Sequence, residues 1–146
     1  MEELVNQMKV CLASVFAFYL KTHNFHWNVE GPNFPQYHSF LDGLYNDVWG
    51  SVDKFGEEIR TLNSYAPASL SRFHTLSVID DQLNIPSASK MIRELELDNK
   101  KLIGELEKAN RMAEEKGCVG LANFLQDRID IHFKHDWMLR SINKAQ

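Results

Sequence analysis

The chain contains only two cysteines, Cys11 and Cys118, among its 146 residues. No CxxC spacing occurs, so neither a redox motif nor a thiolate metal site is indicated. We therefore expect two reduced thiols, as is usual for proteins of the cytoplasm. The length suits one domain with a sizeable buried core, so residues 1–146 are treated as a single domain.

Long hydrophobic runs are missing as well. The longest, from Val10 to Leu20, has eleven residues and is interrupted by Ser14, which is too short to span a bilayer. The first residues, MEELVNQMK, carry acids where a secretory signal needs a basic region. The sequence thus predicts a cytoplasmic protein.

No basic tail marks either end of the chain, and the net charge is −4. Proteins that bind nucleic acids usually carry a basic patch or tail. Folding can still assemble a basic surface from distant residues. From composition alone, cations are the more natural ligands of this acidic protein.

Glycine and proline are scarce, with seven and four residues, and they cluster between segments of helical periodicity. The pattern predicts four long helices and a short one, at residues 3–28, 34–62, 71–83 (the short helix), 87–116 and 119–143. The helices joined by the two short links are expected to be antiparallel neighbours, whereas the link after the second helix is long enough to span the length of a bundle. The predicted fold is all-α: a ferritin-like four-helix bundle with a short helix in the crossover.

Imidazoles and carboxylates are concentrated around the Gly-Pro break after the first helix. His38 and Asp42 are four residues apart on the second helix, and so are Asp53 and Glu57. Each pair projects from one helix face, beside the apolar stripe. His26 ends the first helix and can lean toward His38. Nitrogen and oxygen donors without thiolate suit iron, manganese or zinc, and carboxylates suit oxidised iron.

The spacing along the second helix limits how these groups can combine. His38 and Asp53 are fifteen residues apart, or about 22 Å along a helix. Either other helices complete two separate sites, or an antiparallel second copy brings its Asp53 and Glu57 opposite His38 and Asp42. We favour the shared site, with a two-fold axis near Trp49, because the ligand face lies off the core stripe.

The segments HNFHWNVEGPNF, HSFLDG, DKFGEE and HDWMLR closely resemble the Dps family, the miniferritins. The resemblance covers nearly the whole chain. It implies an inter-subunit ferroxidase site that binds two iron ions and uses no organic cofactor. It also implies a hollow homo-dodecamer that oxidises iron(II), preferably with hydrogen peroxide rather than oxygen, and stores iron(III). By the same resemblance the ligands are His26, His38 and Asp42 of one subunit with Asp53 and Glu57 of its two-fold partner, and Trp27 lies next to them.

Two departures from the family pattern are visible. Glu58 stands where many relatives carry arginine, so a supporting salt bridge is expected to be absent or remade. The lysine-rich N-terminal extension through which many members bind DNA is not present in this sequence. We therefore do not expect DNA binding, and the alternative function is a DNA-binding, nucleoid-protecting protein with a secondary metal site.

Other charged groups receive weaker interpretations. Asp127 and Asp130 on the last helix are candidates for an acidic pore that steers cations into a shell. His132 and Asp136 are i, i+4, but a solvated or interface face is the favoured interpretation. His23 is a candidate second-sphere or secondary metal contact. The outer face of the third long helix is expected to mix both signs of charge: Glu94, Asp98, Lys101, Glu105 and Lys108.

Overall fold

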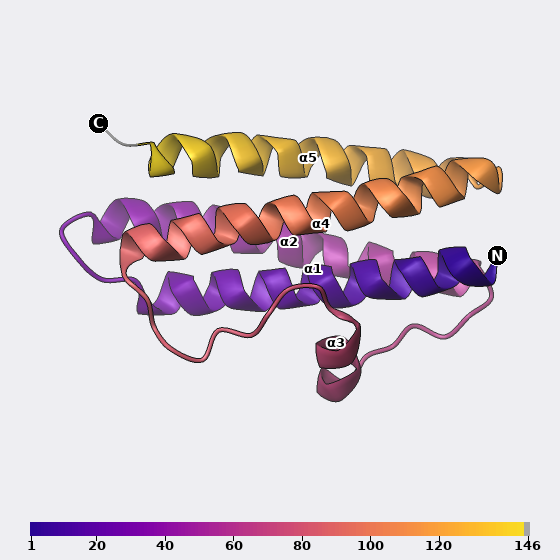
Figure 1. The fold of residues 1–146 in the computed structure, drawn as a ribbon, viewed down its shortest axis with the longest axis horizontal. Helices are drawn as coiled ribbons and strands as arrows, with labels where there is room; N and C mark the ends of the chain where they lie inside the picture. Colours follow the sequence, from indigo (N-terminus) through magenta and orange to yellow (C-terminus); the bar gives the residue numbers. More distant parts are fainter. Residues whose placement is uncertain (145–146) are drawn as a thin grey trace.

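The computed structural model describes residues 1–144, and that part of the chain contains helices and no strands. The helices are α1 (Glu2–Asn28), α2 (Phe34–Thr61), α3 (Leu70–Leu76), α4 (Ala88–Glu115) and α5 (Val119–Asn143). α1 and α2 run antiparallel, as do α4 and α5, and the long crossover makes α2 and α4 run in the same direction (Figure 1). The predicted four-helix bundle with one long crossover is confirmed.

The helix ends follow local chemistry in the connecting segments. Gly31, with φ of 119°, and Gly117, with φ of 70°, occupy the left-handed region that only glycine adopts without strain, and each lies in a short link. The Ser87 hydroxyl accepts a hydrogen bond from the Lys90 backbone N–H at 3.4 Å and caps α4. These features set the two tight turns of the bundle.

The crossover helix is shorter than predicted. The range 71–83 was expected to be helical, but α3 ends at Leu76. Beyond it the chain continues without regular structure, so that Ile79 becomes buried in the core. The Val78 N–H also donates to the Ser14 hydroxyl of α1 at 3.1 Å. Burial of Ile79 and this hydrogen bond stabilise the non-helical path.

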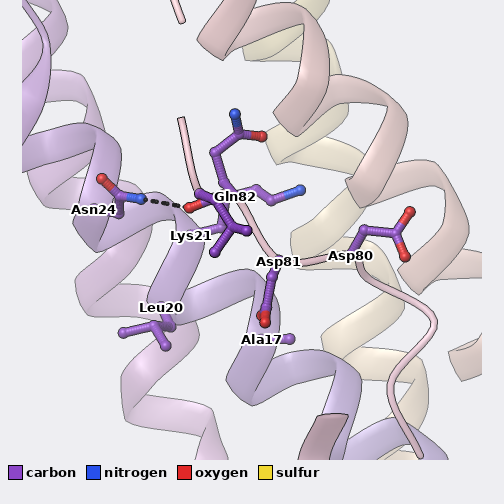
Figure 2. A pocket seen from close by; sticks show the side chains of 8 residues that line it. Ala17, Leu20, Lys21, Asn24, Asp80, Asp81 and Gln82 are labelled. Carbon is purple, nitrogen blue, oxygen red and sulfur yellow. Dashed lines mark hydrogen bonds between the residues drawn. The ribbon is translucent and has the colours of Figure 1, made fainter. Parts of the chain in front are cut away.

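The returning part of the crossover is attached to α1. The Asn24 side-chain amide donates to the Gln82 carbonyl oxygen at 3.4 Å, beside a recess of about 240 Å³ (Figure 2). Lys21, which lines the same recess, forms an ion pair of 2.7 Å with Asp98 of α4, and both side chains are less than a tenth exposed. α1 is therefore bonded to both the crossover and α4.

The hydrophobic core lies between the four long helices. None of the helices within residues 1–144 is long and apolar enough to cross a membrane. The apolar stripe predicted for α2 faces inward, with Leu41, Val48 and Phe55 fully buried. The inner face of α5 differs from that of α2, because it contains polar residues as well as leucines, at helical spacing. The buried residues of that face include Leu121, Leu125, Arg128, His132, Asp136 and Leu139.

Candidate metal site

The last turn of α1 and the first turns of α2 hold His26 and His38 against each other. His26 Nδ1 lies 2.8 Å from the His38 carbonyl oxygen, and His38 Nδ1 lies 2.8 Å from the His26 carbonyl oxygen. The rings are stacked, with centroids 3.8 Å apart and planes 17° apart. The short link through Gly31 makes this approach possible, because it reverses the chain within a few residues.

These two hydrogen bonds fix the chemistry of both rings. A carbonyl oxygen can only accept, so each Nδ1 carries the proton and donates it. In the neutral ring the Nε2 lone pair is then left for another partner. Metal-binding histidines are typically held in this way, with the far nitrogen hydrogen-bonded to a carbonyl or carboxylate. His26 and His38 are thus prepared as nitrogen donors.

Asp42 lies one turn after His38 and points to the same region. Its Oδ1 is 4.0 Å from His26 Nε2, and about half of its side chain is exposed. Asn46 donates from its side-chain amide to the Asp42 carbonyl oxygen at 2.9 Å and to Oδ1 at 3.3 Å. Asn46 therefore orients the Asp42 carboxylate, while part of the Asp42 side chain stays open to solvent.

His23 is engaged in an aromatic cluster beside this group. Its Nδ1 is 2.9 Å from the Tyr19 hydroxyl, and its ring stacks on Tyr45 at 3.9 Å and lies 4.0 Å from Trp27. Burial, together with the charge of nearby His26, lowers the pKa of His23. Because His23 lies beside His26, it remains a candidate for a second-sphere contact to the metal site. Trp27, predicted to be next to the site, is 63% exposed there.

Asp53 and Glu57 lie far along α2, exposed and one turn apart. The pKa of Glu57 is raised because its carboxyl group hydrogen-bonds with Asp53 and is repelled by the Asp53 charge. Two carboxyl groups that repel each other on a solvent-exposed face can bind a cation that offsets both charges. This pair has the electrostatic character expected of a metal-binding half-site.

Glu58, the residue at which the sequence departs from the expected family pattern, forms a local ion pair. Glu58 is buried, and its Oε1 lies 3.0 Å from Lys54 Nζ, one turn earlier on α2. Its other oxygen is 3.4 Å from the Thr61 hydroxyl, which donates to it. Glu58 thus finds its partners within α2.

The structure does not bring all five predicted ligands together in one chain. Among residues 1–144 no group of three or more histidine, cysteine, aspartate or glutamate side chains is arranged to hold a metal ion. His26, His38 and Asp42 form one partial group, and Asp53 with Glu57 forms another. His26 lies on α1 and the other four residues lie on α2, and these two helices pack against each other.

Sequence reasoning missed a charge network between α2 and α5. The Arg128 guanidinium donates to both Asp47 carboxylate oxygens, at 3.1 and 2.9 Å, and His135 Nε2 is 2.6 Å from Asp47 Oδ2. Although burial alone raises the pKa of Asp47, the hydrogen bonds from His135 and Arg128 bring it well below its ordinary value. The helical spacing between Arg128 and the leucines of α5 could have indicated that Arg128 is buried.

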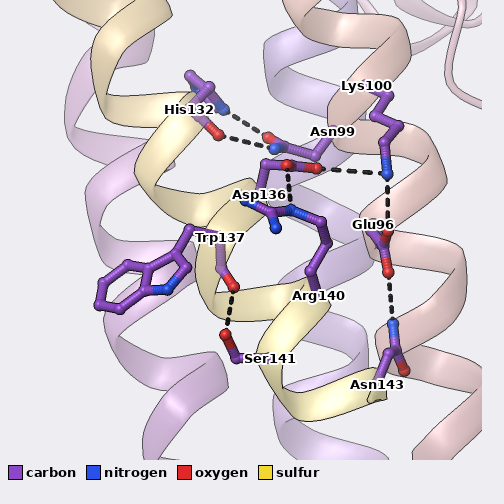
Figure 3. A network of polar contacts seen from close by, with 9 residues as sticks. All are labelled: Glu96, Asn99, Lys100, His132, Asp136, Trp137, Arg140, Ser141 and Asn143. Carbon is purple, nitrogen blue, oxygen red and sulfur yellow. Dashed lines mark hydrogen bonds and ion pairs between the residues drawn. The ribbon is translucent and has the colours of Figure 1, made fainter. Parts of the chain in front are cut away.

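The favoured interpretation of His132 and Asp136, a solvated or interface face, is wrong because both are buried. His132 donates from Nδ1 to the Asn99 side-chain oxygen at 2.8 Å and accepts at Nε2 from Arg128 at 3.1 Å. Asp136 accepts from Arg140 at 2.8 Å, and Lys100 of α4 lies 3.4 Å away (Figure 3). His132 therefore has its partners inside the bundle, whereas Asp136 is paired at the bundle's edge with Lys100 and Arg140, whose side chains are about half exposed.

Asp127 and Asp130 lie exposed in the N-terminal half of α5. Asp130 lines an open recess of about 400 Å³ between α4 and α5, together with Glu107 and Arg111. The position is accessible to solvent. One chain alone does not form a pore at this place, and further subunits would be needed to surround it.

Comparisons with known proteins agree with this fold and its motifs. A family model described as a ferritin-like domain matches residues 5–145. The chain is 33% identical over 131 residues to the "DNA protection during starvation protein" of Brevibacillus brevis, covering 89% of this chain and 87% of the relative. It superposes on the crystal structure of Dps from Staphylococcus aureus with a TM-score of 0.95 and 27% identity, covering 100% of this chain and 98% of that one.

A third comparison connects the fold to metal chemistry. The Dps protein of Vibrio cholerae O1, described as "a member of a broad superfamily of ferritin-like diiron-carboxylate proteins", superposes with a TM-score of 0.94 and 25% identity, over 98% of this chain and 90% of that one. Fold and family model define a ferritin-like protein. Within that class the chain belongs to the Dps miniferritin family, as its sequence motifs predict.

Proposed function

We propose that two copies of this chain form shared di-iron ferroxidase sites, where iron(II) is oxidised before storage as iron(III). The observation that supports this most strongly is the reciprocal bonding of His26 and His38, which leaves both Nε2 atoms available. His26 Nε2 and Asp42 Oδ1 lie 4.0 Å apart, so the imidazole and the carboxylate could both reach an ion between them after a small movement. The description of the Vibrio cholerae relative as a diiron-carboxylate protein supports the choice of iron.

In this proposal the first half-site comprises His26, His38 and Asp42, and the second comprises Asp53 and Glu57 of the partner subunit. A two-fold axis across α2 creates two equivalent sites in each dimer. The raised pKa of Glu57 supports the assignment, because a cation at the Asp53–Glu57 pair relieves their repulsion. Carboxylates also offset the charge gained when iron(II) becomes iron(III).

The reaction is an oxidation of the metal substrate. Two iron(II) ions each give one electron to hydrogen peroxide, which takes up two protons and leaves as two water molecules. Two metals held together avoid a one-electron step that would release hydroxyl radical. Trp27 beside the site can intercept an oxidising equivalent that escapes, since its ring contacts His23, next to the ligands.

Membership of the Dps family supports a larger assembly. We infer a homo-oligomer, a dodecamer built from two-fold dimers, that encloses a cavity for iron(III) in a cytoplasmic protein protecting against iron and peroxide. Asp127 and Asp130 are exposed on α5, and a ring of such carboxylates around a pore would attract iron(II).

Anaerobic titration with iron(II), followed by peroxide, tests this function. We expect saturable binding of two iron ions per site, loss of one peroxide for every two iron(II), and growth of a ferric absorbance. Native mass measurement of the same sample gives the number of subunits. Oxidation no faster than that of free iron(II) in buffer would contradict the proposal.

A further inference from the structure

A second group of possible metal ligands lies inside the bundle, near the middle of the long helices. Asp47 of α2 and His132 of α5 both bond to the guanidinium group of Arg128, and His135 bonds to Asp47. His132 is fully buried and Arg128 is 6% exposed. A carboxylate and two imidazoles are oxygen and nitrogen donors of the kind that bind divalent metal ions. None of these residues belongs to the proposed inter-subunit site.

His132 is held in the way that is typical of metal-binding histidines. Its Nδ1 donates to the Asn99 side-chain oxygen at 2.8 Å, and the Asn99 amide donates to the His132 carbonyl oxygen at 2.9 Å (Figure 3). Burial, with the charge of Arg128 nearby, lowers the pKa of His132, so the ring is neutral and Nε2 carries a lone pair. His26 and His38 show the same arrangement, with Nδ1 bonded and Nε2 available.

The guanidinium group of Arg128 lies between these donors. Its Nη2 is 2.9 Å from Asp47 Oδ2 and 3.1 Å from His132 Nε2. Bonds from a metal ion to such atoms are about 2.0–2.2 Å long, so an ion in place of Nη2 would draw each donor inward by about 1 Å. His135 Nε2, 2.6 Å from the same Asp47 oxygen, can serve as a third ligand once it gives up its proton. Within residues 1–144 the donors as they stand do not form a metal site.

The charge of Arg128 takes the part that a metal ion would take. The hydrogen bonds from His135 and Arg128 hold the pKa of Asp47 well below its ordinary value, so the buried carboxylate is ionised and needs a cation. Arg128 supplies it although its own Nε is buried and has no hydrogen-bond partner in the described part of the chain. A divalent ion beside the guanidinium would be repelled, because the two cations would share a single carboxylate.

A metal ion could reach these donors from solvent. Asp47 and His135 line an open recess of about 480 Å³ between α2 and α5, and Phe40, Leu44 and Met138 form part of its walls. The Asp47 side chain is 31% exposed and that of His135 is 12% exposed. Access therefore does not keep metal ions out of this place, and the charge already present there is the remaining barrier.

We propose that Arg128 determines where this protein binds metal, by occupying a divalent-metal site inside the bundle with its own charge. Without that charge, Asp47, His132 and His135 bind a divalent ion such as iron(II), cobalt(II) or zinc(II). Arg128 thus keeps iron out of the bundle interior and leaves the inter-subunit sites as the place of oxidation. This last consequence rests on the proposed function, whereas the occupation of the site by Arg128 rests on the geometry of one chain.

The test counts the metal ions bound by the full-length protein after the charge has been removed. R128M removes the guanidinium group, R128Q keeps an amide that can bond to Asp47, and R128K is the matched control because it keeps the positive charge. We expect equilibrium dialysis to show one more cobalt(II) ion per chain in R128M and R128Q than in wild type, and no additional ion in R128K. The visible absorption of the additional cobalt(II) should indicate nitrogen and oxygen ligands. Ions bound at the inter-subunit sites cancel in this comparison.

The double variant R128M/H132Q assigns the additional ion to its donors. We expect it to bind the same number of cobalt(II) ions as wild type, because the buried imidazole donor is lost. An additional ion that remains in R128M/H132Q would lie elsewhere and would overturn the proposal. The proposal would also be wrong if R128K gained the same ion, since charge would then not be what excludes the metal.

A melting experiment covers the case in which the variants are unstable. An ion that binds only the folded chain stabilises it, so cobalt(II) should raise the melting temperature of R128M and R128Q more than that of R128K. If cobalt(II) gives neither this difference nor an additional bound ion, Arg128 is a structural ion-pair partner only and the inference fails. Wild-type protein that does not oxidise iron(II) would instead contradict the proposed function, and the cobalt(II) count of R128M would still be interpretable.

Discussion

His26 and His38 each donate their Nδ1–H to the backbone carbonyl oxygen of the other, at 2.8 Å in both directions. The pair joins the end of α1 to the start of α2 across the Gly31 turn. Because the acceptors are backbone atoms, the positions of both Nε2 atoms follow from the fold itself. Both imidazoles are consequently held in place without a metal ion, as the proposed half-site requires.

Removing one of these imidazoles should weaken metal binding directly. We expect H38A to bind iron(II) at least about 10-fold more weakly in anaerobic titration, because a nitrogen donor is lost, while the backbone carbonyl oxygen of residue 38 that orients His26 stays in place. The control is H74A, which removes a histidine of α3 whose Nδ1 is 3.7 Å from Asp81 on the exposed crossover. Equal affinities of H38A and wild type would show that His38 is not a ligand.

Mixing two inactive variants tests whether the site is shared. H26A/H38A lacks one half-site and D53A/E57A lacks the other. If the ligands come from two chains, each mixed dimer contains one intact site and one site with neither half. Co-assembled in equal amounts, the variants should recover about a quarter of the wild-type oxidation rate. Sites built within one chain predict no recovery, and the unmixed variants serve as controls.

The sequence predicted the bundle and the two groups of candidate ligands because both depend on local spacing. The apolar residues of α2 and the pairs His38–Asp42 and Asp53–Glu57 recur at helical intervals. The bonding of His26 to the His38 carbonyl was not predictable, since it depends on how the turn orients the backbone. The placement of Asp98 was missed for a similar reason: its burial beside Lys21 depends on packing between α1 and α4.

The Lys21–Asp98 ion pair gives a stability prediction. Both side chains are less than a tenth exposed, and Nζ lies 2.7 Å from Oδ2. K21M leaves the Asp98 carboxylate buried without its cation, so we expect a loss of about 3–5 kcal/mol in the free energy of unfolding measured with urea. The double variant K21M/D98L should recover most of that loss, because two apolar side chains can replace the pair. If the double variant is as unstable as K21M, the cost comes from packing and not from the unpaired charge.

Acid should weaken the bundle through His132 before it affects Asp47. Burial, with the charges of Arg128 and His135 nearby, lowers the pKa of His132 well below its ordinary value, and the opposing charge of Asp47 does not reverse this. The ring accepts from Arg128 at Nε2 and donates to Asn99 at Nδ1, so a second proton would have to face the guanidinium.

The direction of the pH effect follows from this lowered pKa. Below about pH 6.5 the unfolded chain protonates His132 while the folded chain does not, so stability present near neutral pH is lost as the pH falls, by up to about 1.4 kcal/mol per unit. The pKa of Asp47 is depressed, so its contribution to stability is lost only at pH values below about 4.

Urea unfolding between about pH 7 and pH 5 should therefore show a falling free energy of unfolding in wild type and a flatter profile in H132Q. H23Q, which removes a second histidine of lowered pKa at the bundle surface, should keep most of the wild-type slope. If H132Q and wild type lose stability in parallel over this range, the acid sensitivity belongs to other groups.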